Sequence, residues 1–201
     1  MKAESIAFAV AGMCFGIILG WVLATQEANR PDPAPQTPPP AAAPAAQGQR
    51  QPPALDETLV RTLQAAIEKD PRNADNYAQL GNAYFDAEQW PNAIDSYERS
   101  LKLNPGNPEV STDLGVSYYH TNRADEALAQ FERSLKISPN HTKTLWNKGI
   151  VLAFGKENLQ AAAEEWKKVV TLAPDSPEGQ AARRALEGVA AAHAAQGATN
   201  Q

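Results

Sequence analysis

Four prolines recur along this chain at nearly equal intervals, and each closes a similar stretch of sequence. The segment YERSLKLNP, which ends at Pro105, returns as FERSLKISP at Pro139 and more weakly as WKKVVTLAP at Pro174, while Pro71 closes an earlier stretch. The period of about 34 residues is typical of helical repeats that stack side by side. Because such stacks build extended surfaces, the repeat favours a module that holds other proteins over a catalytic pocket.

The charge and cysteine content exclude several classes of protein. The 201 residues carry a formal net charge of −5, whereas a nucleic-acid-binding domain normally shows a basic stripe. Cys14 is the single cysteine, so the chain cannot form an internal disulfide. We therefore expect no nucleic-acid partner.

An apolar segment, Ile6 to Thr25, has no charged residue between Glu4 and Glu27. As a helix, about 20 residues at ~1.5 Å each would cross the ~30 Å hydrocarbon core of a bilayer. We predict a transmembrane anchor over residues 1–25. A cleavable signal peptide is the alternative, although its apolar region is usually only about 7–15 residues long.

The charges beside this segment predict its orientation. Lys2 and the free amino group lie on the N-terminal side, and Arg30 is the only close basic residue on the other side. By the positive-inside rule the N-terminus would be cytoplasmic, so that in a bacterium the body of this single-pass inner-membrane protein would be periplasmic. Gly12, Gly16 and Gly20 would share one helix face, on which a second transmembrane helix could pack closely.

Residues 26–54 form a linker rich in proline, alanine and glutamine, for which we expect no folded structure. From residue 55 to about 196, apolar residues recur every three or four positions, which predicts helices throughout. The last residues, 197–201, are expected to be a disordered tail.

Each repeat presents the same order of apolar, small and proline positions. In the first unit these are Tyr77, Leu80, Gly81, Tyr84, Ala93, Tyr97, Ser100 and Pro105. The second has Leu114, Gly115, Tyr118, Ala127, Phe131, Ser134 and Pro139, and the third has Gly149, Leu152, Ala162, Trp166, Val169 and Pro174. This pattern resembles the tetratricopeptide repeat, which implies an all-α, right-handed solenoid of about three helix pairs with a capping helix at each end.

The chain departs from the family's pattern at three places. Ser111 stands where the second unit should have its first aromatic residue, and Lys148 replaces a leucine in the third. The third unit also carries one extra residue, which we expect in the turn at residues 155–158. The terminal cap, residues 179–195, should turn Arg183, Arg184 and Glu187 to solvent.

The resemblance implies that the first helix of each pair lines a concave groove for a partner peptide or helix. By position, the predicted binding residues are Asn82, Phe85, Val116, Tyr119, Lys143, Trp146, Ile150 and Phe154. Further positions on the same helix faces are Ala78, Asp86, Thr112, Asp113, His120 and Asn147. Trp146 and Phe154 have an alternative, which is to pack beneath the terminal helix.

Some members of the family grip a terminal carboxylate with a set of basic and amide side chains. Asn82 and Lys143 match that set, but Ala78, Asp113 and Asn147 do not, and Asp113 would repel a carboxylate. We therefore expect an apolar peptide or helix in the groove.

No catalytic residue, metal site or cofactor site is predicted, because His120, His141 and His193 lie in different elements without ligand-spaced neighbours. The sequence thus predicts a membrane-anchored scaffold that binds another protein. An assembly factor or chaperone for envelope or cytochrome c-type proteins, and a stable accessory subunit of a membrane complex, remain open; an enzyme is the least favoured class.

Overall fold

A computed structural model describes residues 52–199 of the chain, where eight α-helices and one π-helical turn follow one another without a strand. The helices are α2 (Glu57–Lys69), α3 (Ala74–Asp86), α4 (Trp90–Leu103), α5 (Pro108–His120), α6 (Ala124–Ile137), α7 (Thr142–Ile150), the π-helical turn η2 (Val151–Gly155), α8 (Leu159–Leu172) and α9 (Pro177–Thr199).

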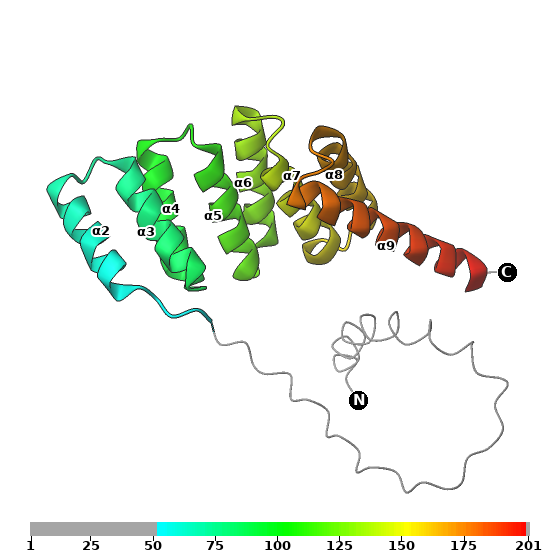
Figure 1. The fold of residues 1–201 in the computed structure, drawn as a ribbon, viewed down its shortest axis with the longest axis horizontal. Coiled ribbons are helices and arrows are strands. Elements are labelled where there is room, and N and C mark those ends of the chain that lie inside the picture. Colours follow the sequence, from blue (N-terminus) through cyan, green and yellow to red (C-terminus); the bar gives the residue numbers. More distant parts are fainter. Residues whose placement is uncertain (1–51, 200–201) are drawn as a thin grey trace, which may run out of the picture. The chain divides into compact units, whose positions relative to one another are not determined.

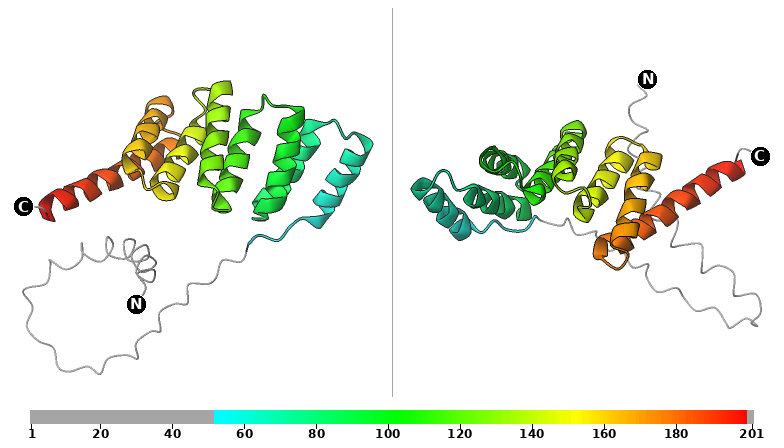
Figure 2. Two further views of the ribbon diagram at one scale, coloured as in Figure 1. Left: turned by 180° about the vertical axis from the view of Figure 1, so that it is seen from behind. Right: turned by 90° about the horizontal axis from the view of Figure 1, so that it is seen from above.

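The helices stand side by side in the order of the sequence (Figure 1). The three predicted pairs are α3 with α4, α5 with α6, and α7 with α8. Helix α2 covers the first pair and α9 covers the last, and the C-terminal part of α9 extends beyond α8 (Figures 1 and 2). This confirms an all-α stack of three helix pairs with a cap at each end of the described chain.

Side chains and prolines set where the helices begin. The side chain of Asn73 accepts hydrogen bonds from the backbone N–H groups of Asp75 and Asn76, as predicted for the start of α3. Asn107 and Asn158 cap α5 and α8 in the same way. Pro91 lies in the first turn of α4, where its missing N–H costs no intrahelical hydrogen bond.

The two helices of each pair cross where a glycine faces an aromatic ring. A methyl group at Gly81, Gly115 or Gly149 would clash with the ring of Tyr97, Phe131 or Trp166, respectively. The alanines that follow in sequence order, at positions 93, 127 and 162, have no exposed surface. These repeated small positions let the backbones approach closely enough for the rings to fill the core.

The extra residue of the third unit lies within its first helix, so the prediction of a longer turn is wrong. Each pair is joined by a three-residue turn with a left-handed residue in the middle: Glu88, Asn122 or Glu157, with φ of 55°, 61° and 53°. The additional residue instead widens the end of α7 into the π-helical turn η2. Val151 at its start is 1% exposed, so the turn is held by core packing.

Lys148 packs well despite replacing a leucine. Its Nζ atom lies 2.5 Å from Glu132 Oε1 and 2.9 Å from Glu165 Oε1, on the two neighbouring second helices. Burial acts to lower the pKa of Lys148, but the two carboxylates outweigh it and raise that pKa, so the amine stays charged. An ion-paired network therefore occupies the position of an apolar contact.

The terminal helix behaves as predicted over its first half, where Arg183, Arg184 and Glu187 are all exposed. It continues to Thr199, past the expected boundary at Gln196. The predicted anchor, its Gly12, Gly16 and Gly20 face, and the linker up to residue 51 lie outside the described residues. Within residues 52–199, no helix combines the length and apolarity that crossing a bilayer requires.

Candidate protein-binding groove

The first helices α3, α5 and α7 contribute to one hollow of about 370 Å³, which we call the central hollow. It is lined by Asn82, Phe85, Asp86, Tyr97, Asp113, Val116, Lys143 and Asn147. Four of these are predicted binding residues, namely Asn82, Phe85, Val116 and Lys143. Sequence reasoning misses Tyr97, because this residue comes from α4 and its place in the repeat predicts the core alone.

Tyr97 serves both the core and the hollow. The residue is 1% exposed, yet its hydroxyl donates a 2.8 Å hydrogen bond to Asn82 Oδ1. Burial, and then the charges of Asp113 and Asp86, raise the pKa of Tyr97, so the phenol stays protonated and remains a donor. The bond occupies the oxygen of the Asn82 amide and leaves its NH₂ group for a ligand carbonyl.

Carboxylates outnumber the amine around the hollow. Lys143 Nζ lies 2.7 Å from Asp113 Oδ1 and 3.5 Å from Glu109 Oε2, so two acids share one cation. Burial raises the pKa of Asp113 although Lys143 acts in the opposite direction. Asp86 is exposed, and its carboxylate makes no hydrogen bond or ion pair with any residue in the described part of the chain.

An apolar wall stands beside these charges. The ring of Phe85 meets that of Trp90 edge-on, with centroids 5.1 Å apart, and lies 6.4 Å from that of Tyr97. Phe85 and Val116 are half-buried and pack against the central core cluster. The wall is therefore supported by the core, and a ligand that covers it would bury additional apolar surface.

Tyr119 and Phe154 line a different hollow, of about 410 Å³, together with His120, Asn122, Ala124 and Gly155. We call it the distal hollow. Phe154 is 68% exposed, because it lies in the π-helical turn rather than on the face of a regular helix. Of the two alternatives for Phe154, the structure supports an open surface.

Trp146 takes the other alternative. It is half-buried and packs, with Ile150, against the cluster that joins α7, α8 and α9. Its ring centroid lies 5.7 Å from that of Trp166, whose Nε1 donates to the Trp146 carbonyl at 3.3 Å. Packing against the C-terminal core thus accounts for both residues, which do not line the central hollow.

Thr112 also differs from expectation, because it does not line the groove. Thr112 is fully buried, where it bonds Thr144 Oγ1 at 2.6 Å and Ser134 Oγ at 3.0 Å. His141, which immediately precedes α7, joins this group: its Nδ1 lies 2.5 Å from Thr144 Oγ1 and its Nε2 lies 2.6 Å from Glu109 Oε1. We call these five residues the junction network, because they tie the second unit to the third.

In the junction network a carboxylate contacts an imidazole, which contacts a hydroxyl, as in a catalytic triad. Thr144 has no exposed surface, however, so its hydroxyl cannot reach a substrate. Within residues 52–199, no group of three or more His, Cys, Asp or Glu side chains is arranged to hold a metal ion. We therefore interpret the network as a structural contact between the second and third units.

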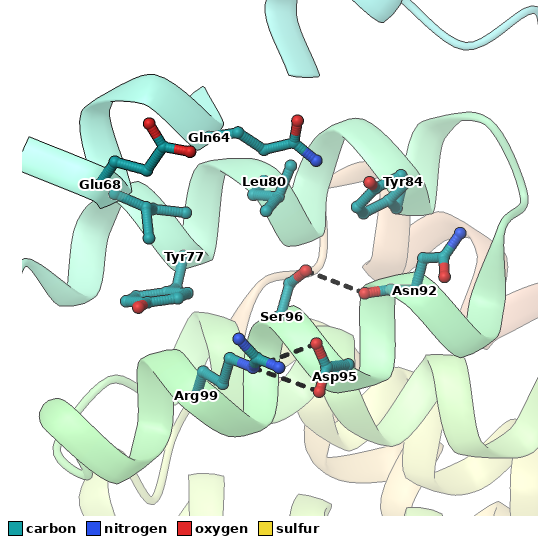
Figure 3. A pocket seen from close by; sticks show the side chains of 10 residues that line it. Gln64, Glu68, Tyr77, Leu80, Tyr84, Asn92, Asp95, Ser96 and Arg99 are labelled. Atoms are coloured by element: carbon teal, nitrogen blue, oxygen red, sulfur yellow. Dashed lines mark hydrogen bonds and ion pairs between the residues drawn. The ribbon is translucent and has the colours of Figure 1, made fainter. Parts of the chain in front are cut away.

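The opposite side of the first pair carries a third hollow, of about 340 Å³, between α2 and α4 (Figure 3). Tyr77, Leu80 and Tyr84 of α3 form its apolar lining. The polar groups at its edge largely bond within their own helix, as in the Asp95–Arg99 ion pair at 3.1 Å.

Comparison with known proteins supports the repeat family. The profile of the tetratricopeptide repeat matches residues 78–142. No curated protein matches the sequence.

Several solved structures share the fold. The first TPR of Spaghetti (RPAP3), bound to the HSP90 peptide SRMEEVD, is 24% identical over 62% of this chain and 96% of its own, with a TM-score of 0.56. MamA is 20% identical over 65% of this chain and 77% of its own, with a TM-score of 0.58. The Arabidopsis OM64 TPR domain is 18% identical over 56% of this chain and 93% of its own, with a TM-score of 0.52.

Proposed function

We propose that this tetratricopeptide-repeat chain is a membrane-anchored scaffold that holds a partner polypeptide in the central hollow. Tetratricopeptide domains are generally non-catalytic modules for protein–protein interaction, and residues 78–142 match that repeat. The observation that carries the proposal is the Asn82 amide, whose oxygen accepts from Tyr97 while its NH₂ group donates to none of the described residues, in a hollow that also has an apolar wall.

The membrane part of the proposal rests on the apolar segment Ile6 to Thr25. A helix of that length spans a bilayer, and the Pro/Ala-rich linker would let the repeat domain reach partners away from the surface. The preference for an uncleaved anchor rests on the length of this segment, and the preference for repeats outside the cytoplasm rests on the balance of positive charge on its two sides.

Crosslinking tests where a partner binds. A photoreactive amino acid at Val116, in the central hollow, should capture the partner from intact cells, whereas the same group at Leu172, exposed on α8, should not. A third position, Tyr119, reports on the distal hollow. Equal capture from Val116 and Leu172 would contradict binding in the groove.

Fractionation tests the anchor and separates the remaining roles. The full chain should stay in the membrane pellet at alkaline pH and become soluble when residues 1–25 are deleted. Stoichiometric copurification of the partner after mild detergent extraction would indicate a permanent subunit. Substoichiometric, salt-sensitive copurification would indicate an assembly factor or chaperone.

A further inference from the structure

The central hollow has a surplus of negative charge that its own residues do not neutralise. Lys143 is the one basic side chain among its lining residues, and it is already shared by Asp113 and Glu109. Asp86 adds a further carboxylate without a partner among the described residues. Two acids and one amine therefore line the hollow, and the amine is shared with a third acid, Glu109, which His141 also contacts.

The two acids of the lining share the hollow with one phenol. Asp86 and Asp113 line the same hollow as Tyr97, and their charges add to burial in raising the pKa of the Tyr97 hydroxyl. That hydroxyl cannot compensate either charge, because its proton is donated to Asn82. The position next to Tyr97 thus favours a cation.

The same charges disfavour a carboxylate ligand. The Lys143 amine is already shared by Asp113 and Glu109, so a third carboxylate would compete with them for one positive charge, and Asp113 is only 17% exposed. One N–H of the Asn147 amide is also committed, since its Nδ2 donates to the backbone carbonyl of Lys143 at 2.8 Å. The Asn82 amide, in contrast, donates to none of the described residues.

The apolar wall sets the second requirement. Phe85 and Val116 line the same hollow as Asp86 and Asp113, so a ligand that satisfies the acids also covers the wall. Long basic side chains suit this mixed surface, because their methylene stems pack on apolar groups while the charged head meets the carboxylates.

We propose that the central hollow selects polypeptide segments in which a lysine or arginine lies beside apolar residues. The basic head would bind Asp86 and Asp113, the apolar neighbours would cover Phe85 and Val116, and the Asn82 amide would donate to the segment's backbone. This inference rests on the proposed function, because it specifies the chemistry of the partner in that groove.

Peptide selection tests the inference on the full-length protein in mild detergent. Random dodecapeptides displayed on phage are panned against it, and the selected peptides are synthesised with a fluorescent label and a benzophenone group. We expect enrichment of Lys or Arg beside apolar residues, and crosslinks to α3, α5 and α7. Replacing the basic residue of a selected peptide with Gln should weaken binding by about tenfold or more, and replacing it with Glu should weaken it further.

A charge reversal at the exposed Asp86 supplies the decisive variant. Asp86→Lys should weaken the basic peptide by about tenfold and improve binding of its Glu version, whereas Asp175→Lys, an exposed acid between α8 and α9, should change neither. Raising the salt from about 50 mM to about 300 mM should weaken wild-type binding, since the Debye length shortens.

The outcomes separate the two proposals. Peptides that crosslink to α3, α5 and α7 without basic enrichment, and that ignore Asp86→Lys, would overturn the charge preference and leave the groove intact. Peptides that crosslink only elsewhere, or a selection that yields no binder, would overturn the groove and with it the inference.

Discussion

Replacing Gly115 by alanine should destabilise the repeat domain, although alanine is the better helix former. A Cβ atom at this position would lie 2.5 Å from Phe131 Cε1 and 3.1 Å from the Ala127 carbonyl oxygen. Phe131 and Ala127 have no exposed surface, so neither can move aside without displacing the α5–α6 crossing. Overpacking of this kind costs about 1–3 kcal/mol, and such a short contact belongs at the upper end of that range.

The gain in helix propensity, about 1 kcal/mol, offsets part of this cost. We therefore expect Gly115→Ala to lower the free energy of unfolding by about 2 kcal/mol. Gly188→Ala is the matched control, because Gly188 lies within α9 and a Cβ atom added there would meet no heavy atom of the described residues within 4 Å. That change should leave stability unchanged or raise it by up to about 1 kcal/mol.

Urea unfolding of the full-length protein, followed by far-UV circular dichroism, measures both variants. With an unchanged dependence on urea, the midpoint reports the change in stability directly. If Gly115→Ala unfolds at the same urea concentration as wild type or higher, the argument that glycine is required by the helix crossing is wrong.

Three further changes test other parts of the structure. Lys148→Ala should lower the free energy of unfolding by about 1–3 kcal/mol, because it leaves the 9%-exposed carboxylate of Glu165 with only one cation; an unchanged thermal midpoint would show that this network adds no stability. Burial acts to raise the pKa of Glu109, but His141 and Lys143 outweigh it and lower this pKa below its usual 4.5. The contribution of Glu109 to stability is therefore present above pH 4.5 and lost as the pH falls below it. Glu109→Gln should flatten the acid side of a plot of melting temperature against pH, and a curve parallel to that of wild type would contradict this. Phe154→Ala should change the free energy of unfolding by less than about 0.5 kcal/mol, because this side chain is 68% exposed; a larger loss would mean that Phe154 belongs to the core.

Repetition is what made much of the fold predictable. The glycine, alanine and aromatic positions recur at one spacing, so three independent stretches predicted the same helix pair. The structure confirms this pairing: the rings of Tyr97, Phe131 and Trp166 each lie against the glycine of their own unit.

The groove was harder to predict, because helix position alone does not say what covers a side chain. Asn82, Phe85, Val116 and Lys143 meet in the central hollow as expected. The local sequence gave little indication of where the structure would differ from these predictions. Nothing in the sequence around Tyr97 indicates that its side chain reaches the hollow from α4. The hydroxyl group of Thr112 likewise gave no sign that it would be buried in the junction network.

The sequence by itself determined the helix pairs, their order and the caps, since those depend on local spacing, capping side chains and prolines. The tertiary structure decided which predicted binding residues stay open. The clearest example is the third unit, where the sequence alone allows the extra residue to lie in the turn or in the first helix. The buried Val151 favours its placement in the helix, as a π-helical turn. That choice leaves Phe154 exposed while Trp146 packs toward α8 and α9, because exposure depends on neighbouring helices as well as on the residue's own position.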